Sequence, residues 1–244
     1  MVKLKHQEIV MGIKSLISIY FERSKPLPQD LHFYLKPKKV IQGAVLVEKN
    51  DMKEEWPIEK LEKEIEIEYL PNLVFDKEES LKHVLAICKN ANKEGYVEGQ
   101  MVWWGIYYKE LLQKHALGPV YLKYIDPVLE WGLFAKADIK ANTFIGEYTG
   151  IVTKYRHFKH RTNGYCFEYS IGQEKTTPYT IDAQNKGNLT RFINHSYKPN
   201  VNQIAVYYDQ MMHIVFKTNR FVAKGEQLTY DYGYYYWEKR EKPL

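Results

Sequence analysis

Two segments near the carboxyl end of the chain contain most of the candidate catalytic and ligand-binding side chains. The first, residues 191–200, places Asn194 and His195 between apolar neighbours. A buried amide or imidazole needs hydrogen-bond partners. These two side chains therefore either satisfy backbone groups of a loop or stand ready to hold a ligand.

The second segment, residues 225–233, leads into a strongly aromatic stretch. Six of the ten residues 228–237 are aromatic, namely Tyr230, Tyr232, Tyr234, Tyr235, Tyr236 and Trp237. Tyrosine combines apolar area with a hydroxyl group, which suits a core or an interface. Aromatic faces also attract cations and can enclose the aliphatic stem of a lysine. The stretch thus predicts either packed aromatic rings or a channel for a cationic side chain.

The first 118 residues have the spacing of helices. Apolar residues recur with near-helical periodicity over residues 4–21. Further helices are expected from Trp56-Pro57 onward, over residues 80–92 and over residues 100–115. Residues 40–47 are more typical of a strand. We therefore expect a mainly helical region over residues 1–118, and its role is not indicated by any motif.

After Pro119 the pattern changes to short strands separated by turns. The expected strands are residues 120–125, 143–152, 165–171, 179–181, 201–208, 212–218 and 226–232. Asp209-Gln-Met separates two of them, which indicates a hairpin. Strands that do not alternate with helices, in a chain without a glycine-rich phosphate loop, disfavour a doubly wound nucleotide-binding sheet. The expected fold class is α+β, with a strand-rich unit over residues 119–244.

Composition limits the classes of protein to which the chain can belong. Its 244 residues are 45% hydrophobic and 27% charged, which is typical of a chain with a buried core. No run reaches the roughly 18 apolar residues that span a bilayer, and the first residues lack the apolar centre of a signal peptide. Two cysteines, Cys88 and Cys166, cannot build a four-cysteine zinc site. We expect a protein of a reducing compartment, without a metal site and without a membrane partner.

The net charge of +5 is unevenly distributed. Residues 48–79 contain 12 Asp or Glu against 5 Lys, whereas the excess of positive charge lies after residue 118. An acidic run is either a solvated helix face or a surface that attracts a basic protein. Direct nucleic-acid binding is not expected, because no nucleic-acid motif accompanies the positive charge.

Together these motifs resemble the SET domain of protein-lysine methyltransferases. The resemblance rests on residues 191–200 and 225–233, preceded in family order by residues 130–135, 146–150 and 165–167, and it covers residues 119–240. It implies short, mostly antiparallel strands with a knot-like chain crossing. Glu130 replaces the usual glycine before Trp131, and no cysteine follows Cys166. The chain is therefore similar to compact, zinc-free SET proteins of bacterial type.

The resemblance implies transfer of a methyl group from S-adenosylmethionine to a lysine of a protein. Tyr232 is then the catalytic tyrosine, Tyr165 lines the lysine channel, and Tyr230 limits the number of methyl groups added, which predicts mainly monomethylation. The residues implied to bind the cofactor are Glu130, Trp131, Gly132, Leu133, Tyr165, Arg191, Phe192, Asn194, His195 and Trp237. The implied substrate is a histone or histone-like basic protein, which the acidic residues 48–79 would help to recruit.

A second interpretation is a non-catalytic module that keeps the SET fold and binds chromatin or basic proteins. Glu130 in place of glycine and the missing cysteine cluster favour it. If the chain is bacterial, we expect it in the cytoplasm or at the nucleoid, with delivery to a host nucleus as the alternative. The sequence does not indicate an oligomeric state.

Overall fold

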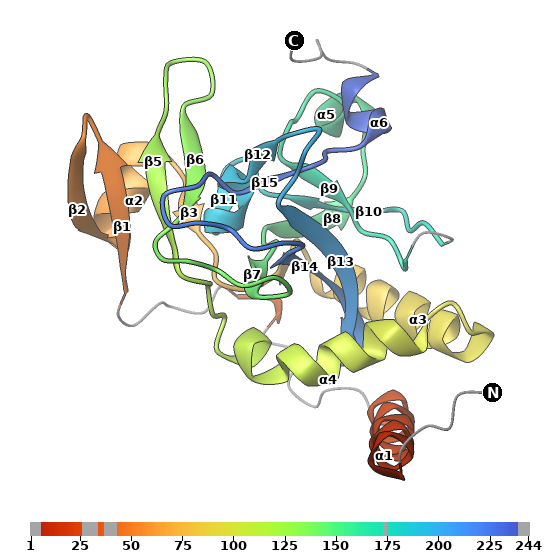
Figure 1. Cartoon of the computed structure of the whole chain (residues 1–244). Coiled ribbons are helices and arrows are strands. Elements are labelled where there is room, and N and C mark those ends of the chain that lie inside the picture. The colour runs from red at the N-terminus through yellow and green to blue at the C-terminus, as the bar shows by residue number, and fades with distance from the viewer. Residues whose placement is uncertain (1–5, 26–33, 37–42, 173–174, 239–244) are drawn as a thin grey trace.

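The computed structural model describes residues 6–25, 34–36, 43–172 and 175–238 (Figure 1). The helices are α1 (His6–Arg23), α2 (Ile58–Ile65), α3 (Glu78–Glu94), α4 (Gly99–Gln113), α5 (His157–His160), α6 (Tyr234–Trp237) and the 3-10 helix η2 (Leu189–Phe192). The strands before residue 118 are β1 (Ala44–Lys49), β2 (Met52–Pro57), β3 (Glu68–Tyr69) and β4 (Val74–Phe75). No helix among the described residues is long and apolar enough to cross a membrane.

The strands after residue 118 are short, as the sequence predicts. They are β5 (Val120–Tyr124), β6 (Trp131–Ala135), β7 (Phe144–Glu147), β8 (Ile151–Lys154), β9 (Cys166–Glu168), β10 (Tyr179–Asp182), β11 (Lys186–Gly187), β12 (Asn194–His195), β13 (Val201–Tyr208), β14 (Met211–Thr218) and β15 (Thr229–Tyr230). Most pairings between neighbouring strands are antiparallel, so the expected α+β class is confirmed. The knot-like crossing stays a prediction.

The sheets combine residues from both sides of position 118. The orders are β2-β1-β5-β6, β4-β8-β10-β9 and β13-β14-β7, with the two-stranded pairs β11-β3 and β12-β15. Parallel pairings of β1 with β5, β4 with β8 and β3 with β11 join the first half to the second. The division at residue 118 therefore stays a prediction about which parts fold independently, since backbone hydrogen bonds cross it.

Local sequence explains several elements directly. α3 begins with Glu78 and Glu79 in its first turn, which complement the helix dipole, and ends at Gly95 with a φ of 89°. The predicted hairpin joins β13 to β14 through Asp209 and Gln210, whose φ values are 51° and 66°. Left-handed values at both central residues are those of the tight turn that matches the strand twist. The hairpin prediction is therefore confirmed.

The strand expected over residues 143–152 is wrong, because the structure divides it into β7 and β8. The interruption includes Gly150, where an added Cβ would lie only 2.7 Å from the backbone oxygen of Asp182. Two backbones approach too closely there for a larger residue. The chain turns at this contact, which places the two strands in different sheets.

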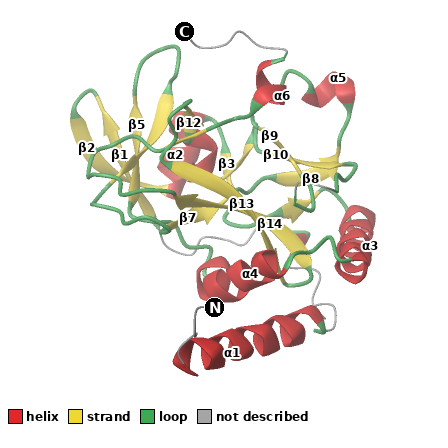
Figure 2. Ribbon diagram, turned by 45° about the vertical axis from the view of Figure 1, so that its right-hand side comes forward, coloured by secondary structure: helices red, strands yellow, loops and turns green. Residues whose placement is uncertain are grey.

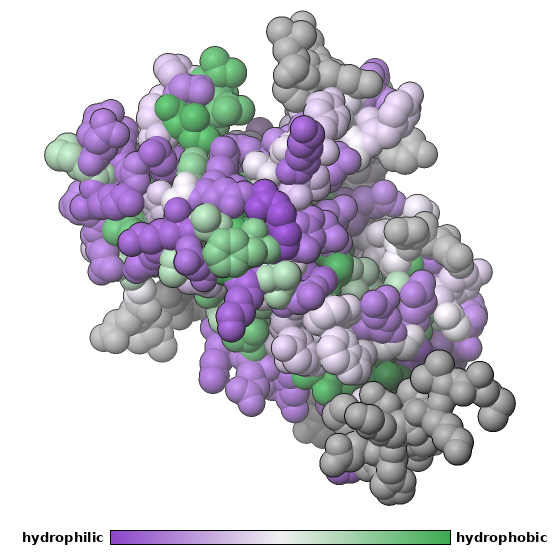
Figure 3. Space-filling view, in the orientation of Figure 1, coloured by the Kyte–Doolittle hydropathy of each residue, from purple (hydrophilic) through white to green (hydrophobic). Residues whose placement is uncertain are grey.

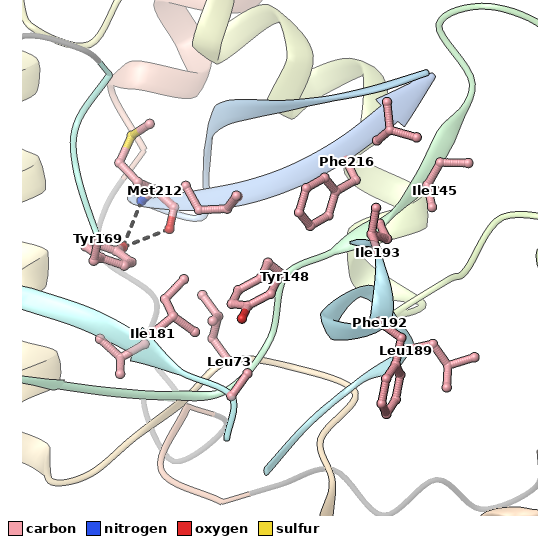
Figure 4. Close-up of a cluster of buried hydrophobic side chains, with 14 of the residues drawn as sticks. Leu73, Ile145, Tyr148, Tyr169, Ile181, Leu189, Phe192, Ile193, Met212 and Phe216 are labelled. Carbon is pink, nitrogen blue, oxygen red and sulfur yellow. Dashed lines mark hydrogen bonds between the residues drawn. The ribbon is translucent and has the colours of Figure 1, made fainter. Parts of the chain in front are cut away.

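Helices cover one end of the strands, and the hydrophobic core lies between the helices and the strands. In Figures 1 and 2, α4 lies along the β13–β14 hairpin, with α1 beyond it and α3 to one side. Figure 4 shows part of the buried cluster, in which Tyr148 directly after β7, Ile193 directly after η2 and Phe216 of β14 meet. At its other end, the Tyr169 hydroxyl donates to the Met212 carbonyl at 2.8 Å. This core fixes the positions of the segments that carry the motifs.

The loop between β5 and β6 exposes apolar side chains. Val128 and Leu129 are 90% and 51% exposed, and the loop forms a green area at the top of Figure 3. Its backbone is held by Asp126, whose carboxylate accepts hydrogen bonds from both of their amides at 2.7 and 2.8 Å. The loop ends at Glu130, immediately before β6.

Glu130 has a φ of 55°, the left-handed conformation that glycine adopts without strain. Its amide donates to the Asp126 carbonyl at 2.8 Å, and its carbonyl accepts from the Ile125 amide at 2.7 Å. The backbone turn expected of a glycine is therefore present despite the substitution. A side chain in this conformation costs about 1–2 kcal/mol.

We predict that Glu130→Gly raises the free energy of unfolding by about 1 kcal/mol, because relief of the left-handed strain exceeds the added entropy of the unfolded chain. Thermal unfolding followed by circular dichroism measures this difference. Glu130→Ala is the matched control, because it removes the charge but keeps the Cβ, and it should give no comparable gain. A lower melting temperature for the glycine variant would contradict the strain.

Candidate functional site

The two motif segments lie side by side through a short parallel pairing. Asn194 of β12 pairs with Thr229 of β15, and His195 pairs with Tyr230. The Asn194 side chain donates to the carbonyl of Trp131 at 3.1 Å, which brings the start of β6 to the same place. Three segments that are far apart in the sequence therefore meet in one place.

His195 presents a hydrogen-bond donor that the described protein does not use. Its Nδ1 accepts from the Tyr232 amide at 3.2 Å, so the neutral ring carries its proton on Nε2. Burial lowers the pKa of His195, although the charge of Asp231 opposes the shift. Nε2 is buried and has no hydrogen-bond partner among the described residues.

Two further buried donors near His195 have no hydrogen-bond partner among those residues. The indole Nε1 of Trp237 is one, and its ring lies 4.8 Å from the His195 ring. The amide Nε2 of Gln227 is the other, and it lies 2.8 Å from where a Cβ of Gly132 would stand. Buried donors are normally satisfied. Their concentration around Trp131–Ala135 and β12 fits a ligand that carries acceptors.

Aromatic rings enclose Tyr232. Its ring centroid lies 4.6 Å from those of Tyr230 and Tyr236, and its ring stacks on Trp237 at 6.1 Å. Phe216 adds a further wall, 4.9 Å from Tyr230. α6 therefore closes the cluster with aromatic side chains, as the sequence predicts for the residues that follow Gly233.

The hydroxyl groups of Tyr230 and Tyr232 stay protonated. Burial raises the pKa of Tyr232 and the pKa of Tyr230 well above the ordinary tyrosine value. The Tyr232 hydroxyl donates to the Ile193 carbonyl at 3.0 Å. These phenols can therefore orient a group through hydrogen bonds, but they do not act as bases near neutral pH.

Tyr165 is fixed against Arg191. The guanidinium lies 3.9 Å from the centroid of the Tyr165 ring and donates to the carbonyls of Ala183 and Gln184 at 2.8 and 2.9 Å. The Tyr165 carbonyl accepts from the Tyr148 hydroxyl at 2.7 Å. Arg191 thus supports the wall that carries Tyr165, and its role as a cofactor ligand stays a prediction.

The other predicted site residues take different positions. The side chains of Leu133 and Phe192 are 0% and 4% exposed and belong to the core, which leaves their backbone groups for any ligand. Glu130 contributes its left-handed turn.

Sequence reasoning missed Gln227 and Tyr148 as members of the site. Gln227 belongs to the motif of residues 225–233, and this position in the motif could have identified it as a site residue. Tyr148 stands in the motif of residues 146–150, yet its hydrogen bond to Tyr165 depends on packing.

Comparison with known proteins agrees with this geometry. Residues 130–233 match the family model described as the SET domain. Histone-lysine N-methyltransferase ash1 of Drosophila melanogaster is 31% identical over 131 residues, which are 50% of this chain and 6% of that protein. Histone-lysine N-methyltransferase SETD2 of Homo sapiens is 36% identical over 107 residues, which are 43% of this chain and 4% of that protein. The chain thus spans less than a tenth of the length of these relatives.

A solved structure is also similar over half of the chain. It is an active polycomb repressive complex 2 in the basal state, with a TM-score of 0.45 and 31% sequence identity, and the match covers 51% of this chain and 16% of that chain. The residues matched by the family model contain β6, the β12–β15 pairing and Tyr232. Residues 130–233 of this chain therefore belong to the SET-domain family.

Proposed function

We propose that this chain is an S-adenosylmethionine-dependent protein-lysine N-methyltransferase. The observation that carries the proposal is the position of unsatisfied buried donors directly beside an enclosed cluster of tyrosines. The SET-domain match supports it, as do relatives that are named histone-lysine N-methyltransferases. One side of the site would then hold the cofactor and the other the lysine.

The residues present fit S-adenosylmethionine, which would supply an electrophilic methyl group. His195 and Gln227 offer buried donors for its nitrogen and oxygen acceptors. Trp237, 4.8 Å from His195, offers an aromatic face for adenine. Trp131 and Gly132 contribute backbone groups beside Asn194. Glu130, Leu133, Tyr165, Arg191 and Phe192 complete the proposed binding set.

The tyrosine cluster explains how a lysine can become a nucleophile. A lysine amine must lose its proton to attack, and its ordinary pKa is about 10.4. Burial between Tyr165, Tyr230 and Tyr232 removes water from the ammonium group and lowers that pKa. The protonated phenols provide no base, so the proton leaves to water before transfer.

Orientation is the remaining task of the protein. The Tyr232 hydroxyl donates its hydrogen bond to the Ile193 carbonyl. The lone pairs of the hydroxyl oxygen are therefore available to accept contacts from the lysine amine and the methyl group. Such an acceptor aligns a polarised methyl group through weak C–H···O contacts. Holding amine and methyl in line converts an encounter of two reactants into a positioned transfer.

The structure weakens one argument for the alternative function, a non-catalytic module that keeps the SET fold. It depends on Glu130 replacing glycine, yet Glu130 adopts the left-handed turn that a glycine would give. The missing cysteine cluster is likewise compensated, since α6 packs its own rings on Tyr232 and His195. Calorimetric titration with S-adenosylmethionine separates the two functions, because a non-catalytic module that has lost the site takes up no cofactor.

We predict that Tyr232→Phe lowers kcat/KM for methyl transfer by about a hundredfold, because it removes one positioned hydrogen-bonding group. Transfer of labelled methyl groups to histones measures the loss, and calorimetry should show cofactor binding retained. Tyr107→Phe is the matched control, since Tyr107 lies 61% exposed on α4. Full activity of the Tyr232 variant would remove that residue from the mechanism.

The number of methyl groups added is proposed to depend on Tyr230. Its ring packs between Phe216 and Tyr232, and its hydroxyl makes no hydrogen bond to the described residues. A neutral hydroxyl of this kind can hold a water molecule in the space that a methylated amine would need. We therefore propose monomethyllysine as the main product.

Replacing Tyr230 by phenylalanine should shift the product toward dimethyllysine and trimethyllysine, because no hydroxyl then holds the water. Mass spectrometry of the modified substrate over time measures the ratio of products. Mostly trimethyllysine from the unchanged protein would contradict the assignment of Tyr230.

The proposed substrate is a histone or histone-like basic protein. Of the acidic segment 48–79, Glu48 is neutralised by Lys53 and Lys123, and Glu54 and Glu68 pair with Lys60 and Lys186. The carboxylates that are exposed and without a described lysine or arginine within 4 Å include Glu55, Glu59, Glu64 and Glu66. A smaller acidic face therefore remains for steering a basic protein toward the enzyme. The bacterial type and the cellular location stay predictions.

A further inference from the structure

A basic segment stands beside the aromatic cluster. Residues 154–161 contain Lys154, Arg156, His157, Lys159, His160 and Arg161 and no acidic residue. The segment follows β8 and forms α5. Within it, Tyr155 is 46% exposed and Phe158 is 100% exposed. We call residues 154–161 the basic segment.

Contacts tie the basic segment to the wall of the proposed lysine channel. In Figures 1 and 2, α5 and α6 lie next to each other. A Cβ on Gly164, just after the segment, would lie 3.1 Å from the Tyr236 hydroxyl, and the Tyr236 ring is 4.6 Å from Tyr232. The chain just after the basic segment therefore lies against the aromatic wall that Tyr236 and Tyr232 form.

A second chain of contacts reaches Tyr165. Lys159 lies 3.3 Å from the Asp182 carboxylate, whose other oxygen accepts from the Asn163 amide at 2.8 Å. Asn163 in turn accepts from the Tyr165 backbone amide at 2.8 Å. The position of α5 and the position of the channel residue are thus linked by hydrogen bonds.

A cavity of about 370 Å³ opens beside α5. Its cationic lining comes from Arg156, Lys159 and Lys186, and its polar lining includes Thr153 and His160. The side chain of His160 is 1% exposed, and its Nδ1 accepts from the Arg156 amide at 2.8 Å. Its Nε2 then carries the proton, 3.7 Å from Asp182 and without a hydrogen-bond partner in the described chain. This buried donor borders the cavity.

The carboxylates around the cavity are already engaged. Asp76 accepts from the Thr153 hydroxyl at 2.8 Å, and Asp182 is held by Asn163 and Lys159. By contrast, no described carboxylate lies within 4 Å of the charged nitrogens of Lys154 or Arg156. The protein therefore leaves positive charge at this edge that its own described acidic residues do not neutralise.

We propose that the basic segment selects substrates whose target lysine lies close to an anionic side chain, either a carboxylate or a phosphorylated residue. Lys154 and Arg156 would meet this side chain, and the cavity beside His160 gives it room. The inference rests on the proposed methyltransferase function and names the substrate class of that site. An anion near one lysine is compatible with a protein that is basic overall.

The shape and charge of the site favour a peptide side chain over a nucleic acid. The cavity is concave and small, and Asp76 and Asp182 line it together with the cations. An extended polyanion would bring several phosphates against these carboxylates, whereas one anionic side chain needs only one or two cations. Duplex DNA is therefore the competing partner in the experiment.

The experiment uses the full chain and short fluorescent peptides with one lysine. Glutamate, phosphoserine or glutamine is placed in turn at each position near the lysine. Binding is measured by fluorescence anisotropy, and methylation is measured as kcat/KM. At one or more positions, glutamate or phosphoserine should be favoured over glutamine by about fivefold, and salt should weaken the preference. The two anions distinguish a carboxylate site from a phosphate site.

Charge reversal tests the residues. In Lys154→Glu/Arg156→Glu the preference for an anion should disappear or change to a preference for glutamine at the same position. Lys14→Glu/Lys109→Glu is the matched control, since it makes the same charge change on α1 and α4, away from α5 (Figure 1). This control should keep the anion preference of the unchanged protein.

Equal binding of all peptides, or an unaltered preference after reversal at positions 154 and 156, would overturn the inference. So would duplex DNA binding that is lost on reversal while the peptides remain indistinguishable. If no peptide is methylated, the proposed function fails, but anisotropy still decides the anion preference. The two failures are therefore distinguishable.

Discussion

The parallel pairing of β12 with β15 is the constraint on which the site depends. Two residues on each strand are too few to be stable by themselves. Asn200, which is 1% exposed, secures the pairing: its side chain donates to the Gln227 carbonyl at 2.8 Å and accepts from the Thr229 amide at 2.9 Å. In a third hydrogen bond, the backbone amide of Asn200 donates to the Thr229 carbonyl at 3.2 Å. One buried asparagine thereby holds the donors of β12 against the tyrosines that follow β15.

A buried hydrogen-bonded pair, Glu147 and His213, supports the segment that leads to β12. Glu147 and His213 lie 2.6 Å apart on β7 and β14, and the Glu147 carbonyl accepts from Asn188 and Thr190 at the start of η2. Burial by itself would lower the pKa of His213, but the adjacent Glu147 carboxylate raises it overall. Removing either partner would leave the other without its buried hydrogen-bond partner. The end of β7 thus carries this buried pair and orients the turn that leads to Asn194.

The sequence allowed local features to be predicted better than long-range ones. Helix start and stop signals located α3 and α4, and Asp209 located the hairpin, because each depends on neighbouring residues. The two-residue strand β3 pairs with β11, and the two-residue strand β4 pairs with β8, in each case more than 70 positions away. No local sequence pattern predicts such pairings. The site followed the same rule. The motifs identified Asn194, His195 and Tyr232, whereas the amide of Gln227 became significant only through its burial beside Gly132.

The aromatic helix α6 is held in place by the packing of its side chains. It has four residues, too few to be stable through its own hydrogen bonds. Its order comes from Tyr236 against Tyr232 and from Trp237 against His195. A ligand that satisfies the buried donors of His195 and Trp237 would bind the ordered form and stabilise it. Closure of the channel and binding of the cofactor would then be linked through the same two rings.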